Sequence, residues 1–377
     1  MTTLSASFSV PYQFSVTFVD NLFDDEDGAQ KIFSNIQDNA AILPVIEQEL
    51  LHYHPDLVEQ ITLLISQYSL VPVSSLILPG GETGKNTPEI VTQVIDSCIE
   101  HQIDRHSYIL AIGGGAFIDM VGYAATITHR GIRLIRMPTT VLAQNDAGVG
   151  VKNAINYQGR KNFLGTFSPP YAVVNSYQFI TSLPKKEKRA GIAEAIKVAL
   201  IKDEVFFDDL YIHRHELSEF HPPVMKRMIK ECARLHMQHI CENGDPFELG
   251  SARPLDFGHW SAHALEELSS FQLRHGEAVA IGILIDAKYS YLQGWLNANE
   301  LSKVEQLILE LQFPVCINTL MKLDIQQSLD NFRAHLGGQL CITMLQGIGH
   351  CHEVNQIDIL LMQQAIDQLV GKVTAVV

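Results

Sequence analysis

Short runs rich in β-branched residues alternate with helix-patterned segments through the first half of this 377-residue chain. The helical segments, residues 87–101 and 116–129, carry apolar residues at three- and four-residue spacing. Strands that alternate with helices in this way form a parallel sheet whose faces the crossover helices cover. We therefore predict an N-terminal Rossmann-like α/β domain. Its strands are predicted at residues 41–46, 74–78, 107–112, 132–137 and 172–175.

The pattern changes after Leu183-Pro184, where β-branched runs become scarce and long amphipathic segments follow one another. We predict two domains, residues 1–183 and residues 184–377, and expect the second to be mostly α-helical. A cleft between two such domains is a common place for a ligand site. The expected helices cover residues 186–202, 223–241, 259–268, 275–294, 299–312 and 356–371.

The charge balance restricts the possible partners. The formal net charge is -15, which argues against nucleic acid or an anionic membrane as a partner. The sequence offers no apolar run of membrane-spanning length, and its first residues lack the pattern of a signal peptide. The six cysteines are scattered and form no CxxC pair, which is typical of reduced thiols. We therefore expect a cytoplasmic protein.

A glycine-rich turn suggests where a nucleotide binds. The predicted strand 107–112 is followed by Gly113-Gly114-Gly115 and then by a helix that contains Asp119. Glycines at such a turn let backbone N–H groups approach a pyrophosphate, and the helix N-terminus attracts its negative charge. The motif differs from GxGxxG, and a tight turn without a ligand remains an alternative.

Three further strand ends carry polar residues. Glu47 ends the first predicted strand and is a candidate for an adenosine ribose. The loop PGGETGK, residues 79–85, offers Glu82 for ribose hydroxyls and Lys85 for phosphate. Thr139 and Thr140 follow the strand 132–137. Because the carboxyl ends of parallel strands form the ligand edge of such sheets, these loops together favour a nucleotide site.

Histidines and a glutamate in the helical half suggest a metal site. His259 and His263 lie four residues apart on one helical face, and His275 begins the next expected helix. Glu194 and Lys197 share a face at a spacing of three. Imidazole and carboxylate ligands suit Zn²⁺ or a similar ion. Sequence spacing alone does not show that these residues form one site. A structural role for each histidine remains an alternative.

Several lysines lie apart from charge runs. Lys152 is flanked by apolar residues and glycine, and Lys161 and Asn162 lie in the glycine-bounded loop 159–165. A cationic, amide-bearing loop suits a phosphate group. Solvated lysines on a loop are the simpler alternative.

Read together, these stretches resemble the 3-dehydroquinate synthase superfamily, the sugar phosphate cyclases. The matching motifs keep the order of that family and span most of the chain. They are PGGETGK (79–85), GGGAFIDMVGYAATITHRG (113–131), MPTTVLAQNDAGVGVKNAIN (137–156), GRKNFLGTF (159–167), SLPKKEKRAGIAEAIKVALI (182–201), DFGHWSAH (256–263) and HGEAVAIGI (275–283).

The resemblance implies a dehydroquinate synthase-like fold, an NAD-binding α/β domain followed by a helical metal- and substrate-binding domain, and a homodimer. It assigns the metal to Glu194, His259 and His275, with Zn²⁺ expected first and Co²⁺ second. It places Arg130 at a phosphate in the partner subunit. The residues that it implies along NAD are Glu82, Lys85, Gly114, Gly115, Asp119, Thr139, Thr140, Lys152, Lys161, Thr181 and, nearby, Phe179.

The implied substrate is a small phosphorylated sugar, faced by Asp146, Lys152, Lys161, Asn162, Lys197 and His263. The implied reaction begins with a transient oxidation by NAD, after which phosphate is eliminated. The ketone is then reduced again, and an intramolecular aldol step closes a carbocycle. No net redox change results. His263 is a candidate proton carrier in this scheme.

Some positions depart from 3-dehydroquinate synthase itself. Asp256 replaces an asparagine that precedes the first metal histidine by three residues, and Val151 replaces a glycine. Arg253, a candidate for the substrate carboxylate, lies one position later than in the family. His236 aligns roughly with a lysine that shares this role, and residues 333–338 replace a C-terminal lysine motif.

These departures resemble cyclases of sedoheptulose 7-phosphate, a substrate without a carboxylate. His263 does not fit this resemblance, since those cyclases often have proline at this position. The combination of these residues resembles the EboD-type branch of the superfamily. We therefore favour a heptulose phosphate without a carboxylate. Three alternatives remain: 3-dehydroquinate synthase proper, an NAD- and metal-dependent polyol dehydrogenase related to glycerol dehydrogenase, and a non-catalytic binding protein.

Overall fold

The computed structural model describes residues 3–158, 160–242, 246–247, 254–270, 272–314, 317–336 and 338–374. The chain divides into two compact units. The first holds Met1–Thr139 and Gly150–Gln178, and the second holds Thr140–Val149 and Phe179–Val377. The domain boundary expected at residues 183 and 184 stays a prediction.

The first unit is built on a parallel sheet, as predicted. Its strands follow the order β1-β9-β6-β5-β2-β3, and β4 also pairs with β2. Every pairing in this sheet is parallel. The strands are β1 (Ser15–Val19), β2 (Ala41–Glu47), β3 (Val71–Pro72), β4 (Leu76–Leu78), β5 (Tyr108–Gly113), β6 (Arg133–Pro138) and β9 (Ala172–Ser176).

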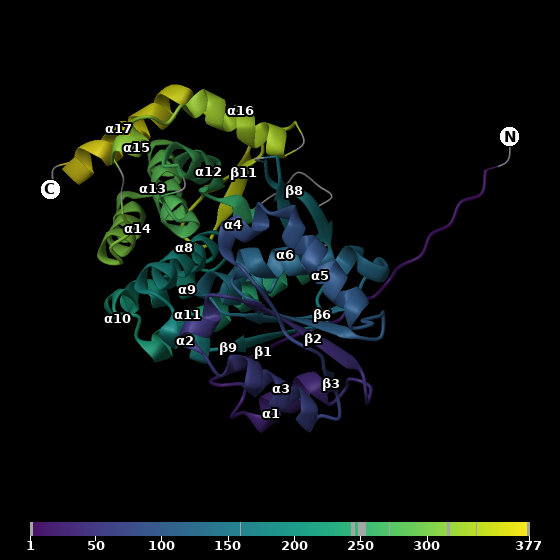
Figure 1. Ribbon diagram of the computed structural model, residues 1–377. Coiled ribbons are helices and arrows are strands. Elements are labelled where there is room, and N and C mark those ends of the chain that lie inside the picture. Colours follow the sequence, from purple (N-terminus) through teal and green to yellow (C-terminus); the bar gives the residue numbers. More distant parts are fainter. Residues whose placement is uncertain are drawn as a thin grey trace. The chain divides into compact units, whose positions relative to one another are not determined.

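Helices cover both faces of this sheet. Figure 1 shows α5 (Pro88–Glu100) and α6 (Gly115–Ile127) on one face, and α1 (Glu26–Phe33) and α3 (Leu57–Gln67) on the other. Every residue of β5 is buried, as expected for a central strand between two helix layers. The core under α5 and α6 includes Leu43, Val45, Ile109, Ala111, Val94 and Val121. The unit therefore has the Rossmann-like architecture that the alternating pattern predicted.

Several elements of the first unit were not predicted from the sequence. The antiparallel hairpin of β7 (Lys152–Tyr157) and β8 (Arg160–Phe167) carries the lysines that were expected on a loop. The edge strand β1 was also missed. The predicted strand 74–78 is shorter in the structure and begins at Leu76. The remaining helices of the unit are α2 (Leu50–Tyr53), α4 (Gly81–Lys85) and the 3-10 turn η1 (Thr128–Arg130).

The second unit is mostly helical, as predicted. Its central element is α13 (His275–Leu292), in which every residue from Gly276 to Ser290 is buried. A helix that is buried on all sides must pack against several others. Here α8 (Lys185–Lys202), α12 (His259–Leu268), α14 (Ala298–Glu310) and α17 (Ile359–Thr374) pack against α13.

Shorter elements complete the second unit. The π-helix η2 (Ala143–Ala147) and the 3-10 turn η3 (Pro254–Asp256) both contact α8. A two-stranded hairpin, β10 (Ile342–Leu345) with β11 (Cys351–Val354), also belongs here. The other helices are α7 (Gln178–Ser182), α9 (Glu204–Ile212), α10 (Arg214–Ser218), α11 (Pro222–Glu242), α15 (Ile317–Leu320) and α16 (Ile325–His335).

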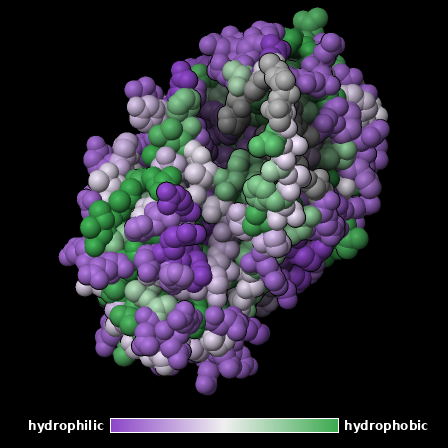
Figure 2. All heavy atoms as spheres, turned by 90° about the vertical axis from the view of Figure 1, so that its right-hand side faces the viewer, coloured by the Kyte–Doolittle hydropathy of each residue, from purple (hydrophilic) through white to green (hydrophobic). Residues whose placement is uncertain are grey.

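On the face shown in Figure 2, hydrophilic residues predominate and apolar residues lie between them. Among the described residues, no helix has both the length and the apolar character needed to cross a membrane.

Candidate metal centre and cofactor edge

Four strand ends meet at the carboxyl edge of the sheet in the first unit. Glu47 at the end of β2 accepts a hydrogen bond from the Gly114 N–H at 2.6 Å. A Cβ atom at Gly80 would lie 1.7 Å from Glu47 Oε1, and one at Gly113 would lie 2.7 Å from Oε2. The Thr139 N–H after β6 donates to the Gly113 carbonyl at 3.0 Å. Gly80 after β4 and Gly113 at the end of β5 therefore let two loops close around one carboxylate.

Charged residues from neighbouring helices lie along the same unit. Lys85 on α4 is buried, and its Nζ lies 2.7 Å from Asp119 Oδ2 on α6. Glu82 accepts a hydrogen bond from Asn156 Nδ2 at 3.2 Å, and its Oε1 lies 4.0 Å from Lys161 Nζ. The structure thus brings Glu47, Glu82, Lys85, Gly114, Asp119, Thr139 and Lys161 into one unit with the sheet edge. Their contacts with NAD stay a prediction.

The remaining predicted residues of the first unit are Lys152, Gly115, Asn162 and Arg130. Lys152 begins β7 and is exposed, and Gly115 begins α6. Asn162 has a positive φ of 52°, and its N–H donates to Asn156 Oδ1 at 2.8 Å. Arg130 follows α6, is exposed and has a φ of 63°.

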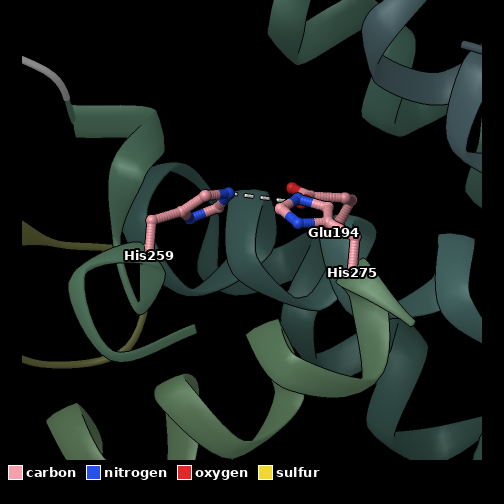
Figure 3. A group of neighbouring side chains, drawn as sticks. All are labelled: Glu194, His259 and His275. Atoms are coloured by element: carbon pink, nitrogen blue, oxygen red, sulfur yellow. Dashed lines mark ion pairs between the residues drawn. The ribbon is translucent and has the colours of Figure 1, made fainter. Parts of the chain in front are cut away.

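Glu194, His259 and His275 converge in the second unit from three different helices (Figure 3). Glu194 comes from the middle of α8, His259 begins α12 and His275 begins α13. Their ligand atoms all lie within 4.8 Å of one another. His259 Nε2 lies 3.7 Å and His275 Nε2 lies 3.5 Å from the same carboxylate oxygen, Glu194 Oε1.

The other nitrogen of each histidine ring is held by an acceptor. His259 Nδ1 lies 3.1 Å from the Phe257 carbonyl oxygen, and His275 Nδ1 lies 3.1 Å from Glu266 Oε2. In the tautomer with the proton on Nδ1, both rings donate outward and direct the Nε2 lone pair toward Glu194. This arrangement is typical of histidines that bind a metal.

Charge and burial also suit a cation. Glu194 is fully buried, and its Oε2 forms an ion pair with Lys197 Nζ. Burial is the largest effect and opposes its ionisation, but Lys197, His275 and His259 together outweigh it and lower the pKa of Glu194. Burial and the charge of Lys197 lower the pKa of His259 to about 3, which keeps this ring neutral. A buried carboxylate and two neutral imidazoles fit a divalent ion.

Asp286 on α13 holds the turn that leads into His259. Its Oδ1 accepts from Trp260 Nε1 at 2.8 Å, and its Oδ2 accepts from the Gly258 N–H at 3.1 Å. Gly258 has a φ of +78°, and a Cβ at Gly282 would lie 2.0 Å from the Gly258 carbonyl oxygen. The two glycines allow the turn to lie directly on α13.

Further polar residues of the second unit lie close to these ligands. The His263 ring lies 5.6 Å from that of His259 and 6.3 Å from that of His275, measured between centroids. Asp146 on η2 lies 2.9 Å from His236 Nδ1. Burial has the largest effect on the pKa of Lys197 and lowers it, whereas the charge of Glu194 raises it. The smaller effects of Asp146 and Asp256 also raise the pKa of Lys197. The predicted residues Glu194, Asp146 and Asp256 therefore all lie near enough to Lys197 to affect its pKa.

Other predicted residues of the second unit have structural contacts. Thr140 Oγ1 accepts from the Ala143 N–H at 3.1 Å at the start of η2. Phe179 is buried in α7, and the exposed Thr181 accepts from Lys188 Nζ through its carbonyl. Arg253 lies outside the described residues. The expected roles of these four residues stay predictions.

Sequence reasoning missed two supporting residues. Glu266 lies seven residues after His259 and three after His263, so the helical spacing of all three places them on one face. That spacing could have suggested it. Asp286 is a single acidic residue in a long apolar segment, and its partners lie more than 25 residues away in the sequence.

Comparison with known proteins agrees with this geometry. Residues 75–190 match the family described as 3-dehydroquinate synthase N-terminal, and residues 191–334 match 3-dehydroquinate synthase C-terminal. The chain is 35% identical to the 3-dehydroquinate synthase of Dichelobacter nodosus over 287 residues, which cover 76% of this chain and 77% of that protein. The chain belongs to the 3-dehydroquinate synthase family.

Two solved structures are similar to this protein over nearly the whole chain. The 2-epi-5-epi-valiolone synthase of Streptomyces hygroscopicus, with NAD+ and Zn2+ bound, is 26% identical with a TM-score of 0.85. The alignment covers 98% of this chain and 99% of that one. A 2-deoxy-scyllo-inosose synthase, complexed with carbaglucose-6-phosphate, NAD+ and Co2+, shares the fold at 24% identity and a TM-score of 0.74, covering 94% and 96% of the two chains.

Proposed function

We propose that this protein is an NAD- and metal-dependent sugar phosphate cyclase that acts on a heptulose phosphate. It is a carbon–oxygen lyase that eliminates phosphate and closes a carbocycle. The observation that carries the proposal is the convergence of Glu194, His259 and His275, each histidine with its Nδ1 held by an acceptor. Membership of the 3-dehydroquinate synthase family supports it.

The two cofactors are proposed at separate parts of the chain. Glu194, His259 and His275 would hold a divalent ion, Zn²⁺ first and Co²⁺ second, which polarises the substrate oxygens when bound. The carboxyl edge of the sheet would hold NAD, which accepts and then returns a hydride. The similar 2-epi-5-epi-valiolone synthase was solved with NAD+ and Zn2+, which supports this pair.

The residues around the ligands perform the binding and proton steps. Lys197 balances the charge of Glu194 and keeps it ionised. His263 lies beside both ligand histidines, where an imidazole nitrogen is placed to exchange a proton with a bound sugar. Asp146, braced by His236, and Asp256 are proposed to face the substrate hydroxyls.

Cations of the first unit are proposed for the substrate phosphate. Lys152, Lys161 and Asn162 lie on the β7–β8 hairpin, and their charge and N–H groups suit the departing group. Arg130 is proposed to reach a phosphate in the partner subunit of a homodimer. We also propose a cytoplasmic location. Free thiols at the described residues Cys98, Cys232, Cys241 and Cys351 support it.

The charges near Lys197 favour a substrate without a carboxylate. Among the described residues that act on the pKa of Lys197, three are carboxylates: Glu194, Asp146 and Asp256. A carboxylated substrate would add a further negative charge beside them. His236 is buried against Asp146 rather than free to pair with a substrate anion. The proposed substrate is therefore a heptulose phosphate rather than a heptulosonate phosphate.

The direct test is phosphate release from a panel of seven-carbon sugar phosphates with and without a carboxylate, in the presence of NAD+ and Zn²⁺. We expect release from the sugars without a carboxylate. A preference for the carboxylated sugar would assign the protein to 3-dehydroquinate synthesis, and no release from any sugar would reject the cyclase.

The same panel tests the part played by His236. His236→Lys places a cation beside Asp146, and we expect it to raise the relative rate on the carboxylated sugar at least about tenfold. Gln238→Lys adds the same charge at an exposed position of α11 and serves as the control. An equal effect of both variants would remove His236 from substrate selection.

A further inference from the structure

A fully buried arginine lies beside the start of the β7–β8 hairpin. Arg136 on β6 is 0% exposed, and its neighbours Ile135 and Met137 are buried as well. Burial lowers the pKa of Arg136 to about 10, and the charge of Asp119 opposes this shift, so the guanidinium stays charged at neutral pH. A buried charge costs free energy unless hydrogen bonds compensate for it. The hydrogen bonds of this guanidinium therefore indicate its role.

The guanidinium donates to the backbone where the chain enters β7. Its Nη1 donates to the Gly150 carbonyl at 2.6 Å, and its Nη2 donates to the Lys152 carbonyl at 3.3 Å. The carbonyl between them, that of Val151, accepts from the Ser168 N–H at 2.8 Å. Three consecutive carbonyls are therefore held, two of them by one planar group. The fixed donor directions of a guanidinium suit it to hold two points of a backbone at once.

Asn153, the residue after Lys152, adds a second attachment. Its side chain is 1% exposed, its Oδ1 accepts from Arg136 Nη2 at 2.8 Å, and its Nδ2 donates to the Ser168 carbonyl at 3.4 Å. Gly122 on α6 leaves room for this side chain, because a Cβ there would lie 1.8 Å from Asn153 Oδ1. The backbone on both sides of Lys152 is thus attached to Arg136.

The side chain of Lys152 has the opposite environment. Lys152 is exposed whereas Asn153 is buried, since successive residues of a strand point to opposite faces. The lysine ammonium lies at the end of a flexible four-carbon stem. Fixing the backbone at both sides of Lys152 therefore restricts the region that its ammonium can reach.

We propose that Arg136 is a positioning residue that directs the Lys152 ammonium toward the phosphate of the substrate. Arg136 is buried and acts through the backbone of Lys152. The inference rests on the proposed function in one respect, the assignment of Lys152 to the phosphate. A misplacement of about 1 Å in a group that positions a substrate can lower a rate about a hundredfold, so a buried anchor of this kind affects the site.

A double-mutant cycle on phosphate binding tests whether Arg136 acts through Lys152. The probe is inorganic phosphate, titrated by calorimetry into the full-length protein with NAD+ and Zn²⁺ present. We expect Lys152→Ala to raise the Kd at least about tenfold, because it removes a charge-assisted contact. Arg136→Gln should raise the Kd at least about fivefold when Lys152 is present and less than about twofold in the Lys152→Ala protein. Equal effects in both backgrounds, or a wild type that binds no phosphate, would overturn the proposal.

Arg136→Lys separates geometry from charge. Lysine keeps the positive charge but replaces the planar fork with a single ammonium. We expect this variant to weaken phosphate binding about as much as Arg136→Gln does. A wild-type Kd for Arg136→Lys would show that the charge alone suffices, and the proposal would then be wrong.

Gly122→Ala tests the same attachment without changing the buried arginine, in case the Arg136 variants fail to fold. The added Cβ displaces the Asn153 side chain from the guanidinium. We expect weaker phosphate binding, again only when Lys152 is present. Gly371→Ala, with open space around the added Cβ, is the matched control and should bind phosphate as the wild type does. A folded Gly122→Ala protein with the wild-type Kd would contradict the role of this attachment.

Phosphate release from the seven-carbon sugar panel is measured on the same variants. A wild type that binds phosphate and gives a non-additive cycle, but releases no phosphate from any sugar, would reject the cyclase and support the role of Arg136. Release by the wild type together with additive effects on the Kd would support the cyclase and overturn the role of Arg136.

Discussion

Two ring nitrogens decide whether the three ligand residues act as one site. Each histidine presents Nε2 to Glu194 because its Nδ1 is held, by a backbone carbonyl for His259 and by Glu266 for His275. Orientation of this kind commonly changes metal affinity by about 10- to 100-fold. His263 lies beside both rings but is not one of the three residues that converge on a common point.

This difference predicts opposite results for two alanine variants. His259→Ala should lose the metal and the activity together, because it removes a ligand. His263→Ala should keep the metal at one ion per chain and lose turnover by about 10²- to 10⁴-fold, as expected for a proton carrier. Metal content by mass spectrometry checks both. A His259→Ala protein that keeps metal and full activity would reject the ligand assignment.

At the residue scale, the sequence led to the ligands only through the family motifs. Spacing placed His259 and His263 on one face and left His275 and Glu194 as separate candidates. The structure selects His259 and His275 because α12 and α13 both begin near Glu194. Helix packing of this kind joins residues about 65 to 81 positions apart, which no local pattern reports.

At the element scale, α13 supports the site at two points. It begins with the ligand His275, and three turns later it presents Asp286 to the turn before His259. Between them, Gly282 lets the Gly258 carbonyl approach the helix. One buried helix therefore positions two ligands.

Gly282→Ala should destabilise the protein because the added Cβ would lie 2.0 Å from the Gly258 carbonyl oxygen. We expect a loss of about 1–3 kcal/mol in the free energy of unfolding, with weaker metal binding. Gly371→Ala, on α17 with open space around the added Cβ, should instead stabilise the protein by about 0.5–1 kcal/mol. Urea denaturation compares them, and equal effects would contradict the packing described.

Asp286 predicts a pH dependence of stability. Burial raises its pKa to about 7, although the Trp260 and Gly258 donors oppose this. A raised pKa in the folded state means that the folded protein binds the proton more tightly than the unfolded one. The protonated side chain therefore contributes fully to the free energy of unfolding below about pH 4, which is the pKa of an ordinary aspartate. This contribution is lost as the pH rises to about 7.

Asp286→Asn should remove this dependence. The free energy of unfolding of the wild type, relative to the variant, should fall with pH between about 4 and 7 by up to about 1.4 kcal/mol per pH unit. Metal-free protein is used for both. Parallel curves for the two proteins would show that Asp286 ionises normally.

The elements themselves were largely predictable. β2, β5, β6, β9, α5 and α6 appear within two residues of the predicted ranges, because buried strands and amphipathic helices have strong periods. The β7–β8 hairpin was missed because β8 is mostly exposed and lacks a buried face. β1 was missed although its alternation is visible, since the same alternation continues through the exposed residues before it.

At the scale of the whole molecule, the two units carry different parts of the proposed chemistry. The first holds the glycine loops and the lysines proposed for NAD and phosphate, and the second holds the proposed metal ligands. A chain of net charge -15 binds an anionic sugar phosphate only where cations are gathered locally. The sequence indicated this division of roles, but the substrate depends on a few side chains around Lys197.

The central claim is a reaction that uses NAD without consuming it. The most direct measurement follows inorganic phosphate and NADH absorbance together while the Zn²⁺-loaded protein acts on a heptulose phosphate with NAD+ in excess. We predict phosphate release over many turnovers with NADH never exceeding about one equivalent per chain. NADH that accumulates in step with substrate consumption, without phosphate, would contradict the cyclase and identify a dehydrogenase.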